Sequence, residues 1–399
     1  MGVLDSAKKM SNDEVMDKII TFSIQEYGLC HGFLGERMKA VLTESRKSGN
    51  ASGVVCALNN ADTHGVLLDL LKEHPRKVMD GISIAAYAMA SSKKTLYIPE
   101  YAPKLMESLK ELASEYQIEL ILGIVDVRAC ERDLLMHIVT ACDLAEKFGG
   151  QSDDSIYVSV NGAPLKKISV EMKISQVTDC SKAKAILLGY RLYKPDVAEL
   201  TLSEVGIENG VISVLTQKDC IVLEVGKKLM ASRIQSCGKC VFCREGLLQL
   251  QYMNNEISVG KGKNEFPQII KEIGTAMEYS TPCTMGQTSA DIVLSAIELF
   301  ESEYVAHIKK KKCSAGVCFS AEKVYIDPKL CVGCGDCMDE CPQDCIEGRT
   351  GYIHMIDEFA CTCCGKCVEV CEEKAVIKTS GKIPKLPNRL TKVGRFRAR

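Results

Sequence analysis

Two runs of cysteine near the end of the chain constrain its fold more than any other feature. The first run is Cys331, Cys334, Cys337 and Cys341, in the spacing C-x2-C-x2-C-x3-C. The second run repeats that spacing further along the chain, with Cys361, Cys364, Cys367 and Cys371. Thiolates at these intervals ligate [4Fe–4S] clusters, and the fourth cysteine of each run then ligates the other cluster. We therefore expect one cluster on Cys331, Cys334, Cys337 and Cys371, and a second on Cys361, Cys364, Cys367 and Cys341.

The composition favours a protein that keeps its cysteines reduced. The chain has 22 cysteines among 399 residues, whereas dense disulfide frameworks belong to small secreted domains. Residues 1–20 contain no secretory apolar segment, and no apolar run reaches the length of about 18 residues that a membrane span needs. A net charge of −2 gives no general attraction to nucleic acid. We expect a cytoplasmic protein whose cysteines bind metal, with structural zinc as the alternative to iron.

A third cysteine motif lies in the middle of the chain. The segment SCGKCVFCREG (236–246) places Cys237, Cys240 and Cys243 in the spacing C-x2-C-x2-C, and Cys283 follows well downstream in TPCTMG (281–286). Three clustered cysteines and a remote fourth can hold a cluster if two helices bring them together. The glycines at 238, 246 and 286 would let the backbone approach inorganic sulfide, because glycine has no Cβ. We expect a third [4Fe–4S] site here, and zinc is again the alternative.

These residues carry a resemblance to a known family. SCGKC-x2-CREG followed by TPC-x2-G is similar to the cluster motif of the NADH-binding flavin subunit of respiratory complex I. It is equally similar to the motif in the β subunits of NAD-dependent [FeFe] hydrogenases and formate dehydrogenases. The flanking stretches 216–240 and 291–308 resemble the helices on either side of that motif. The double ferredoxin segment, preceded by KKCSAGVC (311–318), is typical of the hydrogenase-type β subunits.

The resemblance implies a flavin-type domain at residues 1–150 in a degenerate form. The segment VVCALNNADTHG (54–65) resembles a family segment, and helices and strands alternate as in an α/β fold, with a final helix over 129–147. The family binds FMN phosphate on a glycine-rich loop at a helix N-terminus, and the stretch 28–39 retains little of that loop. Asn60 and Asp62 are left as a weak FMN relic. We expect no FMN and a domain that docks partner subunits.

Five segments are expected along the chain. They are a degenerate flavin-type α/β domain (1–150), a β-grasp, SLBB-like domain (151–215), a four-helix iron–sulfur bundle (216–310), a bacterial-type 2[4Fe–4S] ferredoxin domain (311–380) and a basic tail (381–399). The β-grasp assignment comes from the resemblance, whereas apolar residues at helical spacing over 219–308 predict the bundle. From 378 onwards the chain has eight basic and no acidic residues. That end is interpreted as a solvated tail, or as an arm on an acidic partner.

Several further cysteines lie outside the three cluster motifs. The resemblance implies that Cys220 lies near Cys313, Cys318 and His307. Three cysteines and one histidine suit a tetrahedral zinc ion, and ordinary buried thiols are the alternative. Cys345 lies within the ferredoxin segment but off its pattern.

The function expected from these features is electron transfer through three [4Fe–4S] clusters. The implied partners are a flavoprotein, a thioredoxin-like [2Fe–2S] subunit and ferredoxin, in a hetero-oligomeric complex without nucleic acid or a membrane span. No catalytic residue is expected in this chain. In one alternative the chain still binds FMN and oxidises NADH or reduces NAD⁺, with electron bifurcation in the complex. In another alternative it is a scaffold whose clusters do not turn over.

Overall fold

The computed structural model divides the chain into two compact units, Met1–Ala315 and Gly316–Arg399. Each unit has a hydrophobic core of its own. The described residues are 2–26, 32–58, 65–130, 132–151, 154–206, 210–281, 283–318, 323–357, 360–361, 364–379 and 383–397.

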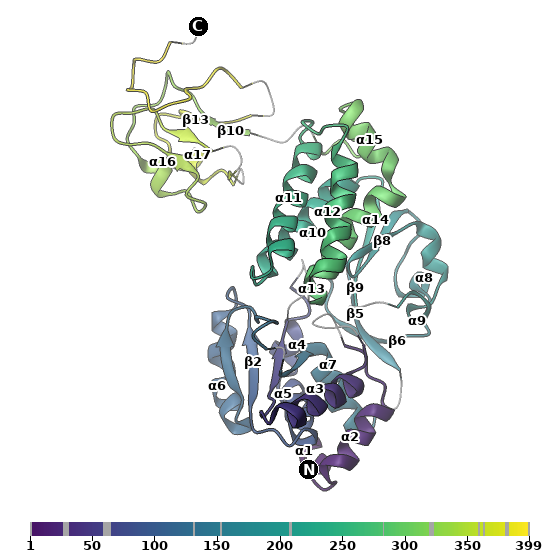
Figure 1. Cartoon of the computed structure of the whole chain (residues 1–399). Coiled ribbons are helices and arrows are strands. Elements are labelled where there is room, and N and C mark those ends of the chain that lie inside the picture. Colours follow the sequence, from purple (N-terminus) through teal and green to yellow (C-terminus); the bar gives the residue numbers. More distant parts are fainter. Residues whose placement is uncertain are drawn as a thin grey trace. The chain divides into compact units, whose positions relative to one another are not determined.

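A parallel four-stranded sheet forms the core of the first 150 residues (Figure 1). Its strands are β1 (Val54–Ala57), β2 (Lys94–Ile98), β3 (Glu119–Leu122) and β4 (Leu134–His137), in the order β3-β2-β1-β4. The helices are α1 (Val3–Ala7), α2 (Asn12–Thr21), α3 (Leu34–Ser48), α4 (Asp69–Glu73), α5 (Pro75–Ala88), α6 (Pro103–Tyr116) and α7 (Ile138–Phe148). Parallel strands need crossover connections, which helices supply here. The α/β class expected for this region is observed.

The predicted helix over 129–147 is wrong in its first part. Leu134–His137 is strand β4, and α7 begins only at Ile138. Leu134, Leu135 and Met136 are almost fully buried, because β4 lies beside β1 in a sheet that helices cover. A short apolar run of this kind has no period that separates a strand from a helix.

A second sheet follows at residues 155–216. Its strands are β5 (Ser155–Val160), β6 (Lys166–Ser169), β7 (Ala183–Leu188), β8 (Arg191–Tyr193) and β9 (Val211–Thr216), in the order β6-β5-β9-β7-β8. Its short helices are α8 (Ile174–Val177), η1 (Pro195–Glu199) and α9 (Leu202–Val205). The β5–β9 pair is parallel and the other pairs are antiparallel.

Helices occupy the rest of the first unit. They are α10 (Ile221–Gln235), α11 (Val241–Ser258), α12 (Phe266–Ser280), α13 (Thr284–Thr288), α14 (Asp291–Leu299) and α15 (Glu301–Lys309). The apolar pattern predicts one helix over 291–308, whereas the structure breaks it at Phe300, whose φ of −127° and ψ of 32° are not helical. Glu301 and Glu303 lie in the first turn of α15, where acidic side chains stabilise a helix N-terminus.

The second unit is built from two similar halves. Its elements are β10 (Lys323–Ile326), α16 (Asp336–Asp339), β11 (Ile346–Glu347), β12 (Met355–Ile356), α17 (Lys366–Val370) and β13 (Val376–Thr379). Strand β10 pairs with β13, and β11 pairs with β12, both antiparallel. This unit is a ferredoxin-like 4Fe–4S domain.

Part of the basic tail packs on this ferredoxin-like domain. The N–H of Ile353 donates to Thr391 O at 2.9 Å, and the N–H of Val393 donates to Gly351 O at 3.2 Å. Phe396 packs against the domain core. Neither of the two interpretations of the tail accounts for these contacts. Among the described residues, no helix is long and apolar enough to cross a membrane.

Candidate iron–sulfur and metal centres

The middle cysteine motif is assembled from the ends of three helices. Cys237 lies in the loop after α10, Cys240 immediately precedes α11, and Cys243 lies in the first turn of α11. Cys283 immediately precedes α13. The chain therefore brings the remote fourth cysteine to the helix ends that carry the other three.

The electrostatics of these four thiols indicate that they converge. Burial raises the pKa of Cys243, a hydrogen bond with Ser236 lowers it, and the negative charges of Cys237 and Cys240 raise it again. Burial likewise raises the pKa of Cys283, and the same three cysteines raise it further, against a backbone contact at Gly286. Four cysteines whose charges act on one another in this way repel as thiolates, so the deprotonated set needs cations among them, as iron would supply.

The three glycines of this region do not share the predicted role. A Cβ on Gly246 would lie 2.5 Å from the sulfur of Met277, so this glycine lets α11 and α12 pack closely. A Cβ on Gly286 would lie 2.7 Å from the Cβ of Thr281. Only Gly238, with a φ of +69° and open space around it, is needed for its backbone conformation.

Two pockets in the second unit collect the ferredoxin cysteines. One is lined by Cys331, Cys334, Cys337 and Cys371. The other is lined by Cys341, Cys361, Cys364 and Cys367, together with Cys345. These are the two sets that the predicted crossover of the fourth cysteine requires. Their role as ligands stays a prediction.

One thiol of each predicted ligand set, Cys337 in the first pocket and Cys367 in the second, has a raised pKa. Burial raises the pKa of Cys337 to about 12, helped by the charges of Cys331, Cys334 and Cys371. Burial also raises the pKa of Cys367, with Cys361, Cys364 and Cys341 adding to the effect. Both pockets therefore share the property of the middle motif and suit an inserted group of positive iron ions.

Cys345 is a neighbour of the second pocket that the spacing rule does not assign. Its sulfur lies 3.4 Å from that of Cys341. Burial, then the hydrogen bond with Cys341, raises the pKa of Cys345 to about 12. Burial also acts to raise the pKa of Cys341, but backbone contacts at Cys345 and Gln343 outweigh it and the pKa is lowered. Of the two thiols, Cys341 is therefore the one that ionises more readily.

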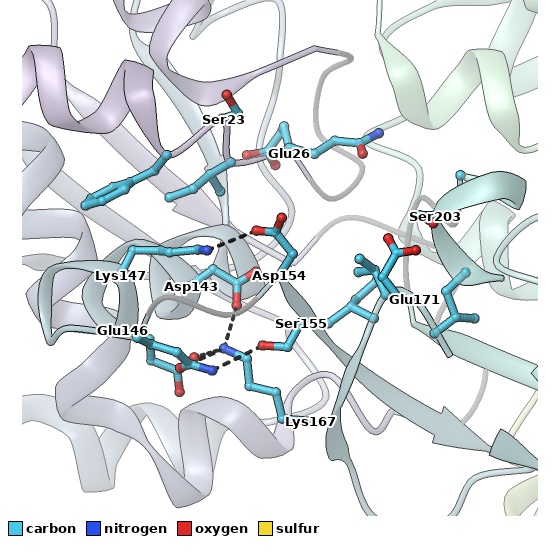
Figure 2. Close-up of a pocket in the computed structure, with 18 of the residues that line it drawn as sticks. Ser23, Glu26, Asp143, Glu146, Lys147, Asp154, Ser155, Lys167, Glu171 and Ser203 are labelled. Carbon is cyan, nitrogen blue, oxygen red and sulfur yellow. Dashed lines mark hydrogen bonds and ion pairs between the residues drawn. The ribbon is translucent and has the colours of Figure 1, made fainter. Parts of the chain in front are cut away.

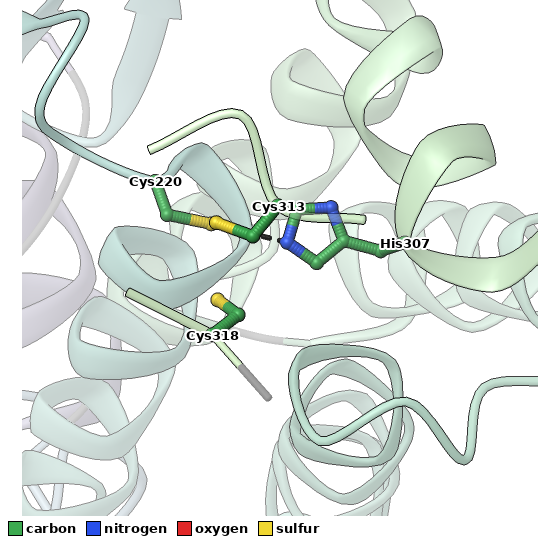
Figure 3. Close-up of side chains that lie close together, drawn as sticks. All are labelled: Cys220, His307, Cys313 and Cys318. Carbon is green, nitrogen blue, oxygen red and sulfur yellow. Dashed lines mark hydrogen bonds between the residues drawn. The ribbon is translucent and has the colours of Figure 1, made fainter. Parts of the chain in front are cut away.

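A separate group of four side chains comes from the start of α10, from α15 and from the segment that follows α15. It consists of Cys220, His307, Cys313 and Cys318, whose ligand atoms all lie within 4.8 Å of one another (Figure 3). Cys220 Sγ lies 3.4 Å from His307 Nε2. Two ligands of a tetrahedral zinc ion, one sulfur and one nitrogen, are separated by about 3.6 Å, from the usual Zn–S and Zn–N bond lengths. The donor set and its spacing therefore fit one zinc ion.

The surroundings of His307 support the same interpretation. Its Nδ1 lies 2.7 Å from the Glu303 carbonyl oxygen, so Nδ1–H donates to that carbonyl and Nε2 points to the cysteines. Burial lowers the pKa of His307, but the hydrogen bonds with Cys220 and Glu303 outweigh it and raise the pKa to about 9. A metal ion at this position would replace the proton on Nε2. Residues adjacent to metal ligands commonly orient the imidazole in this way.

The predicted flavin relic lies outside the described residues, since neither Asn60 nor Asp62 is among them. A pocket of about 740 Å³ lies elsewhere in the first unit (Figure 2). Lys147 forms an ion pair with Asp154 at 3.1 Å, and Lys167 contacts both Glu146 and Asp143. Carboxylates already neutralise these lysines, so this pocket does not suit the phosphate of a flavin nucleotide.

Comparison with known proteins identifies two segments of the chain. Residues 228–307 match the NADH-ubiquinone oxidoreductase-F iron–sulfur binding region. Residues 323–375 match the 4Fe-4S dicluster domain. The chain therefore contains one iron–sulfur region of the NADH-ubiquinone oxidoreductase-F type and one dicluster domain, and the resemblance expected from the motifs is confirmed.

Individual proteins similar to this chain are subunits of hydrogenases and of NADH-quinone oxidoreductases. The chain is 35% identical over 146 residues to the NADP-reducing hydrogenase subunit HndC of Solidesulfovibrio fructosivorans, covering 37% of this chain and 30% of that relative. It is 28% identical over 102 residues to the F subunit of the NADH-quinone oxidoreductase of Mycobacterium bovis, covering 26% of this chain and 23% of that one. The matches thus span less than a third of these relatives' length. The protein is an iron–sulfur chain related to these subunits.

The fold has a neighbour among solved structures. A chain of an NAD⁺-reducing [NiFe]-hydrogenase in the H2-reduced state superposes with a TM-score of 0.62 at 15% identity. The superposition covers 76% of this chain and 64% of that chain. At this identity the likeness concerns the fold.

Proposed function

We propose that this chain is an electron-transfer subunit of a multi-subunit oxidoreductase, with three [4Fe–4S] clusters. One cluster would be held by Cys237, Cys240, Cys243 and Cys283, and the other two by the crossed sets of the second unit. The observation that carries this proposal is the gathering of twelve cysteines into three groups of four. The clusters supply one-electron chemistry, and the protein contributes burial, ligation and hydrogen bonds that set their potentials.

The flavin chemistry of the relatives is assigned to a partner. The expected partners are a flavoprotein or thioredoxin-like [2Fe–2S] subunit on one side, and ferredoxin or another redox protein on the other. This assignment follows from the reduced glycine-rich stretch at 28–39 and from the ion-paired lysines of the large pocket. The β-grasp assignment of 151–215 belongs to the same proposal, supported by the strand order β6-β5-β9-β7-β8 with a parallel central pair.

Elemental analysis tests the proposal directly. The full chain, purified without oxygen, should contain about twelve irons, as three cubane clusters require, and no flavin. Replacing Cys237 with alanine should remove about four irons. Cys142→Ala is the matched control, because this thiol is fully buried and lies in none of the groups. Iron near eight in the unmodified chain would overturn the three-cluster proposal, and one bound FMN would assign the flavin chemistry to this chain.

We also propose that Cys220, His307, Cys313 and Cys318 hold one structural zinc ion. Zinc analysis of the same sample should give about one ion per chain. His307→Ala should lose it, because an N,S₃ site without its nitrogen lacks the fourth ligand. The iron content should stay unchanged in that variant. A full zinc content in His307→Ala, or none in the unmodified chain, would contradict the assignment.

A further inference from the structure

The two cysteine runs of the second unit belong to a longer internal repeat. Cys331 N–H donates to Asp327 O at 3.0 Å, and at the equivalent place in the second half Cys361 N–H donates to Asp357 O at the same distance. Ile326 corresponds in the same way to Ile356. Each residue that lines one cysteine pocket can therefore be compared with the residue at the equivalent position of the other pocket.

The linings of the two pockets differ at His354, which corresponds to Val324, and also at Glu373, which corresponds to Gln343, and at Ala375, which corresponds to Cys345. Val324 and Ile356 line the pocket of Cys341, Cys361, Cys364 and Cys367. In the other pocket, the corresponding pair is His354 and Ile326. An imidazole therefore stands in one half where the other half has an isopropyl group.

The protein holds this imidazole tightly beside the cysteines. His354 is 1% exposed, and among the described residues its ring nitrogens make no hydrogen bond of ordinary geometry, although the backbone of Tyr352 lies near enough to raise its pKa. A Cβ on Gly348 would lie only 2.1 Å from its ring, so that glycine leaves the space which the imidazole fills. The neighbouring backbone is fixed by the Ile353 N–H bond to Thr391. A buried polar group without a partner is costly, which indicates that something in the pocket completes it.

The group best placed to accept a hydrogen bond from the His354 ring is a sulfur atom in the same pocket. Burial lowers the pKa of His354, which favours a neutral ring with one N–H donor. The pocket that it lines contains four thiolate candidates, and a bound cluster adds inorganic sulfide. A hydrogen bond to sulfur withdraws negative charge and stabilises the reduced cluster, which carries one more electron.

We propose that His354 donates a hydrogen bond to the cluster of Cys331, Cys334, Cys337 and Cys371, and holds its midpoint potential above that of the neighbouring cluster. The inference rests on the proposed function, since it requires both clusters. His354 would act through the cluster and not on a substrate. By raising the midpoint potential of this cluster, it would make it the one of the two that is reduced first. The valine at 324 leaves the other cluster without the same donor.

The experiment is a redox titration of the full chain, followed by electron paramagnetic resonance, with iron and sulfide measured on each sample. His354→Val copies the residue of the other half, and should shift one midpoint potential downwards with iron unchanged. His354→Gln, which keeps an N–H donor, should shift it less. Labelling histidine with a magnetic nitrogen isotope should show coupling to one reduced cluster, which His354→Val abolishes.

Each outcome decides the inference. Unchanged potentials in His354→Val at full iron content would overturn it while leaving the proposed function intact. An unmodified chain without iron in the second unit would overturn both. If His354→Val loses a cluster, the reciprocal Val324→His variant decides: an upward shift of the other cluster's potential supports the inference, and no shift refutes it.

Discussion

At the scale of single residues, Cys345 offers a test of which sulfur binds iron. Its thiol lies beside Cys341. The corresponding residue in the second half of the repeat is Ala375, a buried residue whose side chain has no sulfur. Cys345→Ala should therefore keep the full iron content, because the corresponding pocket holds its four cysteines without a sulfur at this position. Cys341→Ala should lose about four irons.

Iron analysis of the two variants, with Cys142→Ala as the control, distinguishes the roles. If Cys341→Ala kept its iron and Cys345→Ala did not, the ligand assignment within this pair would be reversed. Either variant leaves the other pocket, around Cys331, with its own four cysteines.

Residue spacing predicts candidate ligands, but it does not predict the other residues that line their pockets. Eleven of the twelve candidate cysteines lie in short runs of regular spacing, as expected where a cluster fixes the distance between its ligands along a short loop, and Cys283 alone is remote. Cys345 and His354 obey no such rule, since they reach the pockets through the packing of β11 and β12. The internal repeat was the signal that could have found His354, because Val324 stands at the equivalent position.

At the scale of elements, the junction of β4 and α7 makes stability sensitive to acid. His137 is fully buried, and its Nδ1 accepts a hydrogen bond from Val139 N–H at 3.1 Å, which caps α7. Burial lowers its pKa to about 3, below the value of about 6.5 expected in the unfolded chain. Between these values only the unfolded chain binds the proton, so stability falls as the pH falls from about 6.5 towards 3.

Replacing His137 with asparagine should reduce this acid sensitivity. Asparagine also caps helices but does not titrate. Each pH unit within the window costs up to about 1.4 kcal/mol for one such group, so the unmodified protein should lose about 1 kcal/mol more than the variant between about pH 6.5 and 5.5. Urea unfolding followed by circular dichroism at both pH values measures the difference. Equal losses in the two proteins would show that His137 does not carry the effect.

Element prediction succeeded for the helices of residues 219–280 and failed at strand β4 and at the break in 291–308. The amphipathic pattern of residues 219–280 predicts helices that the structure contains as α10, α11 and α12. The four buried residues of β4 were assigned to a helix, and the break at Phe300 was missed. Both errors arise because contacts distant in the sequence decide these backbones, here the β1 pairing and the start of α15.

At the scale of the whole molecule, the second unit should fold and bind iron without the first. Val324, Ile326, Ile346, Ile353 and Val376 form a core of its own, and a core of its own is the mark of an autonomous domain. Residues 323–399 expressed alone should hold about eight irons, and residues 1–318 about four irons with one zinc. A second unit that fails to retain iron would show that it depends on the rest of the chain.

The division of the molecule was predicted more completely than its end. The two cysteine runs mark the ferredoxin-like unit, and the composition of 378–399 suggests a solvated tail or an arm on an acidic partner. That Thr391 and Phe396 pack on this unit could not be deduced, because isolated contacts of a basic segment leave no period in the sequence. The basic side chains of the tail remain candidates for contact with an acidic partner.

The internal repeat of the second unit has a practical consequence for measurement. Temperature, salt and electrode calibration act on both clusters of a molecule together, so the gap between their two midpoints is largely free of those errors. A substitution in one half can thus be judged against the untouched half within a single sample. The duplicated domain supplies its own internal standard.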